Sequence, residues 1–160
     1  MDVHIFGIHK DEPRALLDWV THHSRIVGSA NIHLIDNKSE LPEVKSMLSA
    51  VVEAGVDLVK FDGSFSEKHT VVTSLMLKFN KPGTMLVPLD IDEFLVAALP
   101  HGKFSINRTL ILRRFNEVPR DNKAKYKFTA YEAMNCNITA EGTFVKRAKY
   151  FRHLQLHRRH

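Results

Sequence analysis

The sequence predicts an α/β fold: a mixed, mainly parallel sheet flanked by helices, with an antiparallel extension after residue 100. Between residues 3 and 89, short apolar runs alternate with segments whose apolar residues recur at helical spacing, and the links between them are short. This alternation is typical of a parallel sheet with helices on both faces. After residue 100 the alternation ends, and residues 104–118 and 126–134 have the pattern of longer strands with Arg and Lys interleaved.

Four strands and three helices are expected in the first part of the chain. The strands are expected at residues 3–8, 31–35, 56–61 and 84–89, and the helices from Pro13 to Gly28, at about 42–54 and at 66–80. Proline suits a first helical turn, where its missing N–H costs nothing, and glycine suits a helix end. Pro13 and Pro42 therefore predict two helix starts, and Gly28 and Gly55 predict the matching ends.

The first and third helices each have a predicted core face. Asp11 and Glu12 precede Pro13 and are expected to cap the first helix. The residues expected to pack inward are Leu16, Leu17, Trp19, Val20, Ile26 and Val27 in the first helix, and Val71, Val72, Leu75, Met76 and Phe79 in the third.

Composition favours one soluble domain over residues 1–160. The hydrophobic content of 44% and charged content of 26% are ordinary for a globular protein, and no apolar stretch is long enough to span a membrane. Cys136 is the only cysteine, which favours a reducing, cytoplasmic location, or a host cytoplasm if the protein is viral. Six of the 23 Lys and Arg residues lie from Lys146 onward, where no acid occurs. A general nucleic-acid binder would show a broader basic face, so no nucleic-acid partner is expected.

The most informative motif is Asp90-Ile91-Asp92, directly after the expected strand at 84–89. If the backbone stays extended there, the carboxylates of Asp90 and Asp92 point to the same side, because side chains in a strand alternate. Two hard oxygen ligands on one side suit Mg²⁺ or Mn²⁺ bound together with substrate phosphates. Open α/β sheets also bind ligands outside the carboxyl ends of their strands. A metal–nucleotide site is therefore expected at this point.

Three segments together resemble the glycosyltransferases of the GT-A fold, in particular small viral or bacterial enzymes with an Asp-x-Asp motif. The matching segments are Lys10-Asp11-Glu12 with Leu17-Asp18-Trp19 and His22-His23, then 34–39, then 89–95. Their order covers roughly residues 3 to 96. The resemblance implies a nucleotide-binding half over residues 1–96 and an acceptor-binding and closing half over residues 97–160. Phe144-Val145-Lys146-Arg147 followed by Leu156-His157 is similar to the closing element of the family. Because the chain ends soon after His157, the acceptor-binding region is expected to be reduced or missing.

The resemblance implies a hexosyl- or deoxyhexosyl-transferase that uses a nucleoside diphosphate sugar, in the first place a UDP-sugar, and a glycan or glycoprotein hydroxyl as acceptor. Mn²⁺ or Mg²⁺ would be its cofactor. The implied roles are the following: metal ligation by Asp90, Asp92 and His157; catalysis by Asp92 and Glu93; contact with base and ribose by residues 7–12, especially Gly7, Ile8, His9, Lys10 and Glu12; nucleoside binding by Asp36; and phosphate pairing by Lys68, Arg147 or Arg152. Glu93 could position a ligand or act as a general base.

Two other functions remain open on the sequence alone. One is an Asp-x-Asp phosphatase, in which the first aspartate is the nucleophile. Such a motif normally lies on the first strand and continues with Thr or Val, whereas three expected strands precede Asp90 and residue 94 is Phe. The other is a nucleic-acid-binding module that uses the basic C-terminus and the aromatic residues Tyr126, Phe128, Tyr131, Tyr150 and Phe151.

Overall fold

A computed structural model of the chain describes residues 2–117, 126–127 and 157–158. The chain forms two compact units, Met1–Phe94 and Leu95–His160. The first unit holds a layered α/β structure, and the described residues of the second form short strands, one 3-10 helical turn and one α-helix. Each unit is described by itself below.

The first unit is built on a four-stranded parallel sheet. Its strands are β1 (Asp2–His9), β2 (Ile32–Asn37), β3 (Asp57–Phe61) and β4 (Thr84–Asp90), in the spatial order β3-β2-β1-β4. All three neighbouring pairs are parallel. This confirms the four predicted strands and the parallel sheet.

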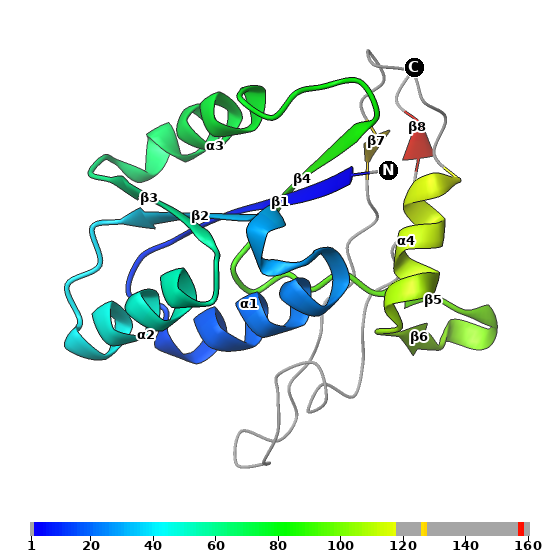
Figure 1. Ribbon diagram of the computed structural model, residues 1–160, viewed down its shortest axis with the longest axis horizontal. Coiled ribbons are helices and arrows are strands. Elements are labelled where there is room, and N and C mark those ends of the chain that lie inside the picture. Colours follow the sequence, from blue (N-terminus) through cyan, green and yellow to red (C-terminus); the bar gives the residue numbers. More distant parts are fainter. Residues whose placement is uncertain (1, 118–125, 128–156, 159–160) are drawn as a thin grey trace. The chain divides into compact units, whose positions relative to one another are not determined.

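Helices cover both faces of this sheet. The helices α1 (Pro13–Val27) and α2 (Pro42–Glu53) lie on one face, and α3 (Lys68–Leu77) lies on the other (Figure 1). The first two helices connect strands that step outward from β1 to β3, while α3 carries the chain back across to β4. Right-handed crossovers in opposite directions place their helices on opposite faces, which explains the arrangement.

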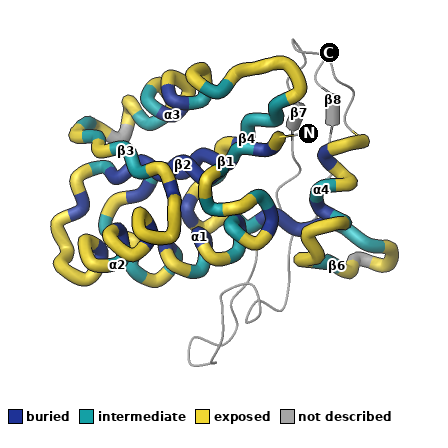
Figure 2. The backbone as a smooth tube through the Cα atoms, viewed as in Figure 1, coloured by how far each residue is buried: buried dark blue, intermediate teal, exposed yellow. Residues whose placement is uncertain are grey.

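The core lies on both sides of β1 and β2, which are the most continuously buried strands (Figure 2). On the α3 face, Phe6 and Ile35 form a cluster with Val72 and Leu75. The remaining inward residues predicted for this helix, Val71, Met76 and Phe79, pack against the cluster as expected.

On the other face, α1 buries a stripe that includes Trp19, His23 and Ile26. The prediction that Leu17 packs inward is wrong, because its side chain is 41% exposed. Leu17 is one residue beyond Leu16, which rotates it about 100° around the helix and away from the stripe.

The predicted acidic cap of α1 is also wrong in its details. Glu12 is at the N-cap position but its side chain makes no capping hydrogen bond. The Asp11 carboxylate instead accepts hydrogen bonds from the backbone N–H groups of Glu40 (2.8 Å) and Leu41 (2.9 Å), just before α2. Asp11 therefore ties the loop after β1 to the loop after β2.

The second unit corrects the strand predicted at 104–118. The strands β5 (Ala97–Ala98) and β6 (Phe104–Ser105) form a short antiparallel pair, and residues Arg108–Asn116 form helix α4. Asn107 caps α4 by accepting a hydrogen bond from the N–H of Leu110 (3.2 Å). Ile111 and Phe115, four residues apart, are its buried residues, so helical spacing outweighs the strand-like composition.

The expected strand at 126–134 is described only at its beginning. There β7 (Tyr126–Lys127) pairs antiparallel with β8 (His157–Arg158), and residues 128–134 lie outside the described part of the chain. Both antiparallel pairs form separate two-stranded sheets, so within the described residues they do not extend the parallel sheet.

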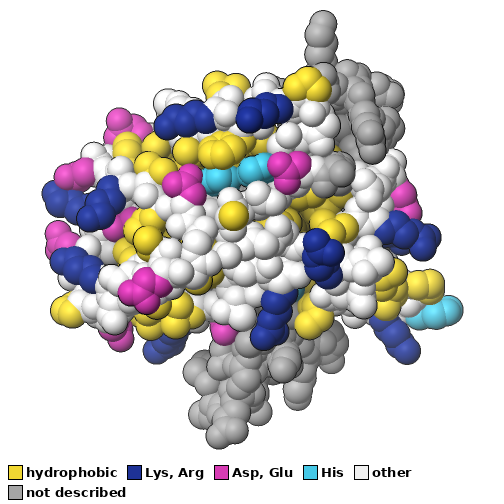
Figure 3. All heavy atoms as spheres, viewed as in Figure 1, with side chains coloured by type: hydrophobic (Ala, Val, Ile, Leu, Met, Phe, Trp, Pro, Cys, Tyr) yellow, Lys and Arg dark blue, Asp and Glu magenta, His cyan; other side chains and the backbone are white. Residues whose placement is uncertain are grey.

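A chain of polar side chains crosses the first three strands on the α3 face. His4 Nε2 lies 2.9 Å from Asp2 Oδ2, His4 Nδ1 lies 2.8 Å from His33 Nε2, and His33 Nδ1 lies 2.8 Å from Asp57 Oδ2. The ring of Phe79 covers the two imidazoles. Figure 3 shows imidazole side chains beside one another between acidic side chains and next to hydrophobic ones. Hydrogen bonding thus compensates the burial of His33.

Candidate functional site

The strand order places a topological switch point between β1 and β4. The chain leaves β1 toward β2 and β3 on one side and returns to β4 on the other side. In open α/β sheets, ligands bind in the crevice outside the carboxyl ends of the strands at such a point. A pocket of about 440 Å³ lies there, within the size range of small-molecule sites. This switch-point pocket is lined by Ile8, His9, Lys10, Glu12, Asn37, Lys68, Asp90, Ile91 and Asp92.

Asp90 and Asp92 both line the switch-point pocket, although not for the predicted reason. The backbone does not stay extended: β4 ends at Asp90, and Ile91 and Asp92 form a turn. The turn is closed by a hydrogen bond from the Glu93 N–H to the Asp90 carbonyl oxygen (2.9 Å). Ile91 is buried and anchors the turn, while the two aspartates on either side of it are exposed. The turn, rather than strand alternation, brings both carboxylates to one pocket.

Glu93 holds this turn from its other end. Its Oε2 accepts a hydrogen bond from the backbone N–H of Asp90 (2.9 Å). Burial raises the pKa of Glu93, and the nearby carboxylates of Asp90 and Asp92 raise it further, against the opposing effects of the Asp90 N–H and the Lys68 ammonium. Glu93 is not among the residues that line the pocket. Its contacts are those of a side chain that fixes the conformation of Asp90.

Lys68 brings a cation to the acidic turn. It is the first residue of α3, and its Nζ forms an ion pair with Asp90 Oδ1. The Lys68 side chain is 20% exposed, so most of its length is packed in the protein. Lys10, at the end of β1, supplies a second cation to the same pocket. Two lysines and three carboxylate residues, Glu12, Asp90 and Asp92, thus line one small pocket.

His9 and Asp36 lie together on the opposite face of the sheet edge. They are direct neighbours across β1 and β2, and His9 Nε2 lies 3.7 Å from Asp36 Oδ1. The His9 side chain is fully buried, and neither of its ring nitrogens has a hydrogen-bond partner among the described residues. Burial lowers the pKa of His9, against the opposing charges of Asp36 and Asp11. The buried His9 ring thus lies next to a buried carboxylate.

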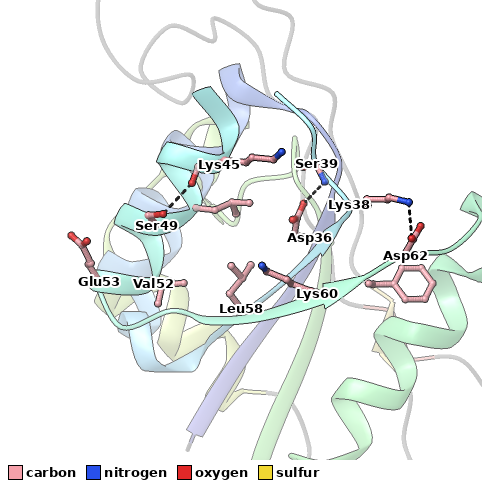
Figure 4. Close-up of a pocket in the computed structure, with 12 residues that line it drawn as sticks. Asp36, Lys38, Ser39, Lys45, Ser49, Val52, Glu53, Leu58, Lys60 and Asp62 are labelled. Atoms are coloured by element: carbon pink, nitrogen blue, oxygen red, sulfur yellow. Dashed lines mark hydrogen bonds and ion pairs between the residues drawn. The ribbon is translucent and has the colours of Figure 1, made fainter. Parts of the chain in front are cut away.

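Asp36 lines a second pocket rather than the one that contains Asp90. This α2-side pocket, of about 800 Å³, has an apolar wall of Leu48, Val52 and Leu58 between α2 and β3 (Figure 4). Its polar lining residues are Asp36, Lys38, Ser39, Lys45, Ser49, Glu53, Lys60 and Asp62. Figure 4 shows Lys60 reaching toward the side of Asp36, and Lys38 turned away to its ion pair with Asp62 (2.8 Å). The predicted nucleoside ligand and the predicted metal ligands therefore belong to two pockets.

Hydrogen bonds join the loop after β1 to the loop after β2 beside these pockets. The Asp11 N–H donates to Ser39 Oγ (3.0 Å), and the Ser39 N–H donates to Asp36 Oδ1 (3.0 Å). Asp11 and Lys38 both have positive φ angles, 50° and 53°. Non-glycine residues in this conformation are uncommon and cluster at functional sites. The link from Asp11 to Ser39 and to the start of α2 could not be predicted from the sequence, because these partners are nearly thirty residues apart in the chain.

Asn37 lines the switch-point pocket although it was not among the predicted site residues. It makes two hydrogen bonds with the backbone of Gly63, each of 3.2 Å. These bonds hold the loop after β3 against the end of β2. The signal was present in the sequence, since Asn37 directly follows Asp36 at a strand end, where both residues favour turns.

Gly7 does not line either described pocket. A Cβ at this position would lie 2.8 Å from Cη2 of Trp19, closer than real contacts allow, so the indole ring packs directly on the strand. This packing gives a structural reason for glycine at residue 7. Its contribution to ligand binding stays a prediction.

The donor set of the switch-point pocket fits a divalent cation in its chemistry. Two carboxylates on one turn are hard oxygen ligands, as Mg²⁺ and Mn²⁺ prefer. Among residues 2–117, 126–127 and 157–158, no group of three or more His, Cys, Asp or Glu side chains is placed to hold a metal. Substrate phosphates would have to complete the coordination. The backbone of His157 lies in β8, in the second unit, and Arg147 and Arg152 lie outside the described residues, so their roles stay predictions.

Comparisons with known proteins add no assignment. No helix in the described part of the chain has the length and apolar character needed to cross a membrane. No protein-family model matches the sequence, and neither a curated protein nor a solved structure matches the chain.

Proposed function

We propose that the protein is a metal-dependent glycosyltransferase that moves a sugar from a nucleoside diphosphate sugar, in the first place a UDP-sugar, to a hydroxyl group of a glycan. The observation that carries the proposal is the composition of the switch-point pocket: Asp90 and Asp92 face it together with Lys10 and Lys68. Carboxylates for a cation and ammonium groups for phosphates are the two halves of a metal–diphosphate site. The single cysteine supports a cytoplasmic setting.

Asp90 and Asp92 would hold the metal, which would be Mn²⁺ or Mg²⁺. When bound, the ion offsets the negative charge that develops on the departing nucleoside diphosphate. The task of the protein is to keep both carboxylates in place before the substrate arrives. Buried Ile91 and the two hydrogen bonds between Asp90 and Glu93 do this by fixing the turn. Of the two roles open to Glu93, these contacts favour the positioning role.

Phosphate oxygens would be bound by the cations of the pocket and by the start of α3. Lys68 is the first residue of this helix, and the first turn contains no acid. The N-cap residue is Glu67, whose carboxylate accepts hydrogen bonds from Ser64 and does not cap the helix. The N–H groups of such a first turn point at an anion and carry the positive end of the helix dipole. The N–H groups at the helix start and the Lys68 ammonium would both attract an anion that binds next to the Asp-x-Asp turn.

Asp36 is proposed to accept hydrogen bonds from the nucleoside. Asp36 Oδ1 accepts a hydrogen bond from the Ser39 N–H, and His9 Nε2 lies 3.7 Å from the same oxygen. The apolar wall formed by Leu48 and Leu58 in the same pocket suits the face of a base. Ile8, His9, Lys10 and Glu12 remain the proposed contacts from the end of β1, because they line the pocket that would contain the diphosphate.

A panel of nucleotide sugars tests the proposal. Each donor is added with Mn²⁺, and the shift in unfolding temperature and the slow hydrolysis of the donor are measured. A ligand that binds only the folded state raises the apparent stability, by about 2.7 kcal/mol at one hundred times its dissociation constant. We expect one donor, a UDP-sugar, to stabilise the protein and to be hydrolysed.

The matched variants are Asp92→Ala and Glu43→Gln. Asp92→Ala is expected to abolish the Mn²⁺-dependent part of donor binding while the fold survives, because Asp92 is exposed. Glu43→Gln removes one negative charge from the exposed first turn of α2, outside both pockets, and should leave donor binding unchanged. Donor binding of equal strength without metal in Asp92→Ala would refute the site. Salt-sensitive binding of oligonucleotides without metal would instead favour the nucleic-acid module.

A further inference from the structure

The Asp-x-Asp turn already has a cation bound to it, and that cation belongs to the protein. Lys68 Nζ contacts Asp90 Oδ1, and the two residues come from the start of α3 and the end of β4. The Lys68 side chain is 20% exposed, whereas Asp90 is 51% exposed. The ammonium is thus held by packing of its own stem against the pocket wall, not only by the carboxylate that it meets.

A divalent ion on Asp90 would need the space that the ammonium now occupies. Both cations are attracted to the Asp90 carboxylate, and two cations on one carboxylate repel each other in a partly buried site. Bare metal therefore binds less tightly while Lys68 keeps its partner. A diphosphate changes this balance, because its oxygens offer Lys68 a new anionic partner within the same pocket.

We propose that Lys68 is a built-in competitor for the metal, which makes the pocket bind a metal–diphosphate pair in preference to the bare ion. The inference rests on the proposed function, since it assumes that Asp90 ligates the ion. When the diphosphate binds, Lys68 moves from Asp90 to phosphate and the ion takes its place. Linkage then requires the effect to be mutual: diphosphate raises metal affinity by the same factor by which metal raises diphosphate affinity.

Binding of Mn²⁺ alone tests the competition without any turnover. Free Mn²⁺ is measured by electron paramagnetic resonance in titrations of the wild type and of Lys68→Met. We expect Lys68→Met to bind bare Mn²⁺ about tenfold more tightly, a change of about 1.4 kcal/mol. Inorganic pyrophosphate should raise Mn²⁺ affinity strongly in the wild type, and by a clearly smaller factor in Lys68→Met, because the competing ion pair is already absent.

Two control variants separate competition from a general loss of positive charge. Lys10→Met removes a cation from the same pocket without breaking the pair at Asp90, and it should tighten bare Mn²⁺ binding much less than Lys68→Met does. Lys78→Met removes an exposed cation at the other end of α3 and should have no effect. Lys68→Arg keeps a cation beside Asp90 and should bind bare Mn²⁺ as weakly as the wild type. Lys68→Gln also removes the ammonium group and should tighten bare Mn²⁺ binding as Lys68→Met does, which keeps the test decisive if Lys68→Met does not fold.

The outcomes distinguish the two proposals. If bare Mn²⁺ binds equally to the wild type, Lys68→Met and Lys68→Arg, the competition is refuted, while donor hydrolysis still decides the proposed function. If Lys68→Met binds bare Mn²⁺ more tightly but no nucleotide sugar is hydrolysed, the competition holds and the transferase proposal fails. If no variant binds Mn²⁺ with or without pyrophosphate, Asp90 is not a metal ligand and both proposals fall.

Discussion

The replacement Gly7→Ala tests whether this glycine serves packing rather than ligand binding. An alanine Cβ would lie 2.8 Å from Cη2 and 3.0 Å from Cζ2 of Trp19. Trp19 is fully buried, so its ring cannot move toward solvent to make room. Overpacking of this kind costs about 1–3 kcal/mol, and alanine recovers up to about 1 kcal/mol by restricting the unfolded chain. We therefore expect a net loss of about 1–2 kcal/mol in the free energy of unfolding.

The double variant Gly7→Ala/Trp19→Phe isolates this contact. Trp19→Phe removes the outer part of the indole that meets residue 7, and by itself it costs stability because it leaves a cavity. In that background Gly7→Ala should be close to neutral, so that the two changes interact by about 1 kcal/mol or more. Urea unfolding of the four proteins gives the cycle. An equal cost of Gly7→Ala in both backgrounds would show that the indole is not the reason for glycine.

Two further predictions concern stability. The free energy of unfolding should fall as the pH drops below about 6.5, by up to about 1.4 kcal/mol per pH unit for each histidine, because burial lowers the pKa of His9 and His23 and both take up protons on unfolding. Urea unfolding at a series of pH values measures this, and His23→Asn should reduce the slope. Asp11→Ala should cost about 1–2 kcal/mol, because two backbone N–H groups lose their partner. Asp11→Asn should cost less, since it keeps an acceptor oxygen and tolerates positive φ; an equal cost for both would contradict the hydrogen-bond explanation.

The first four strands could be predicted because local signals and tertiary structure agree there. Each strand is a short apolar run, and two of the three intervening helices begin at a proline, Pro13 or Pro42, whose fixed φ suits a first helical turn. Both of these helices are followed by a glycine, Gly28 or Gly55, with a positive φ that favours glycine. Residues 104–118 lacked this agreement. Their alternating Arg and apolar residues fit a strand as well as a helix, and only the cap at Asn107 with buried Ile111 and Phe115 decides for the helix.

The candidate site could be predicted in its residues better than in its geometry. Parallel strands bring all their carboxyl ends to one edge, so residues 8–12, 36–37 and 90–92 had to lie along the same edge of the sheet. The strand order then places β1 between β2 and β4. The ion pair of Lys68 with Asp90 could not be foreseen. It depends on where α3 begins relative to β4, and a surface position for Lys68 was equally compatible with its place at a helix start.

The register explains why the expected site is divided between two pockets. Ile8 is paired with Ile35 on one side and with Asp90 on the other, whereas His9 is paired with Asp36. Successive residues of a strand point to opposite faces, so Asp90 shares the α3 face with Ile8, and Asp36 shares the α1 and α2 face with His9. A ligand that touches both carboxylates must therefore cross the edge of the sheet at the ends of β1 and β2. A nucleoside diphosphate can do this because its base and its phosphates are separate binding groups, joined by a ribose that would lie over the crossing point.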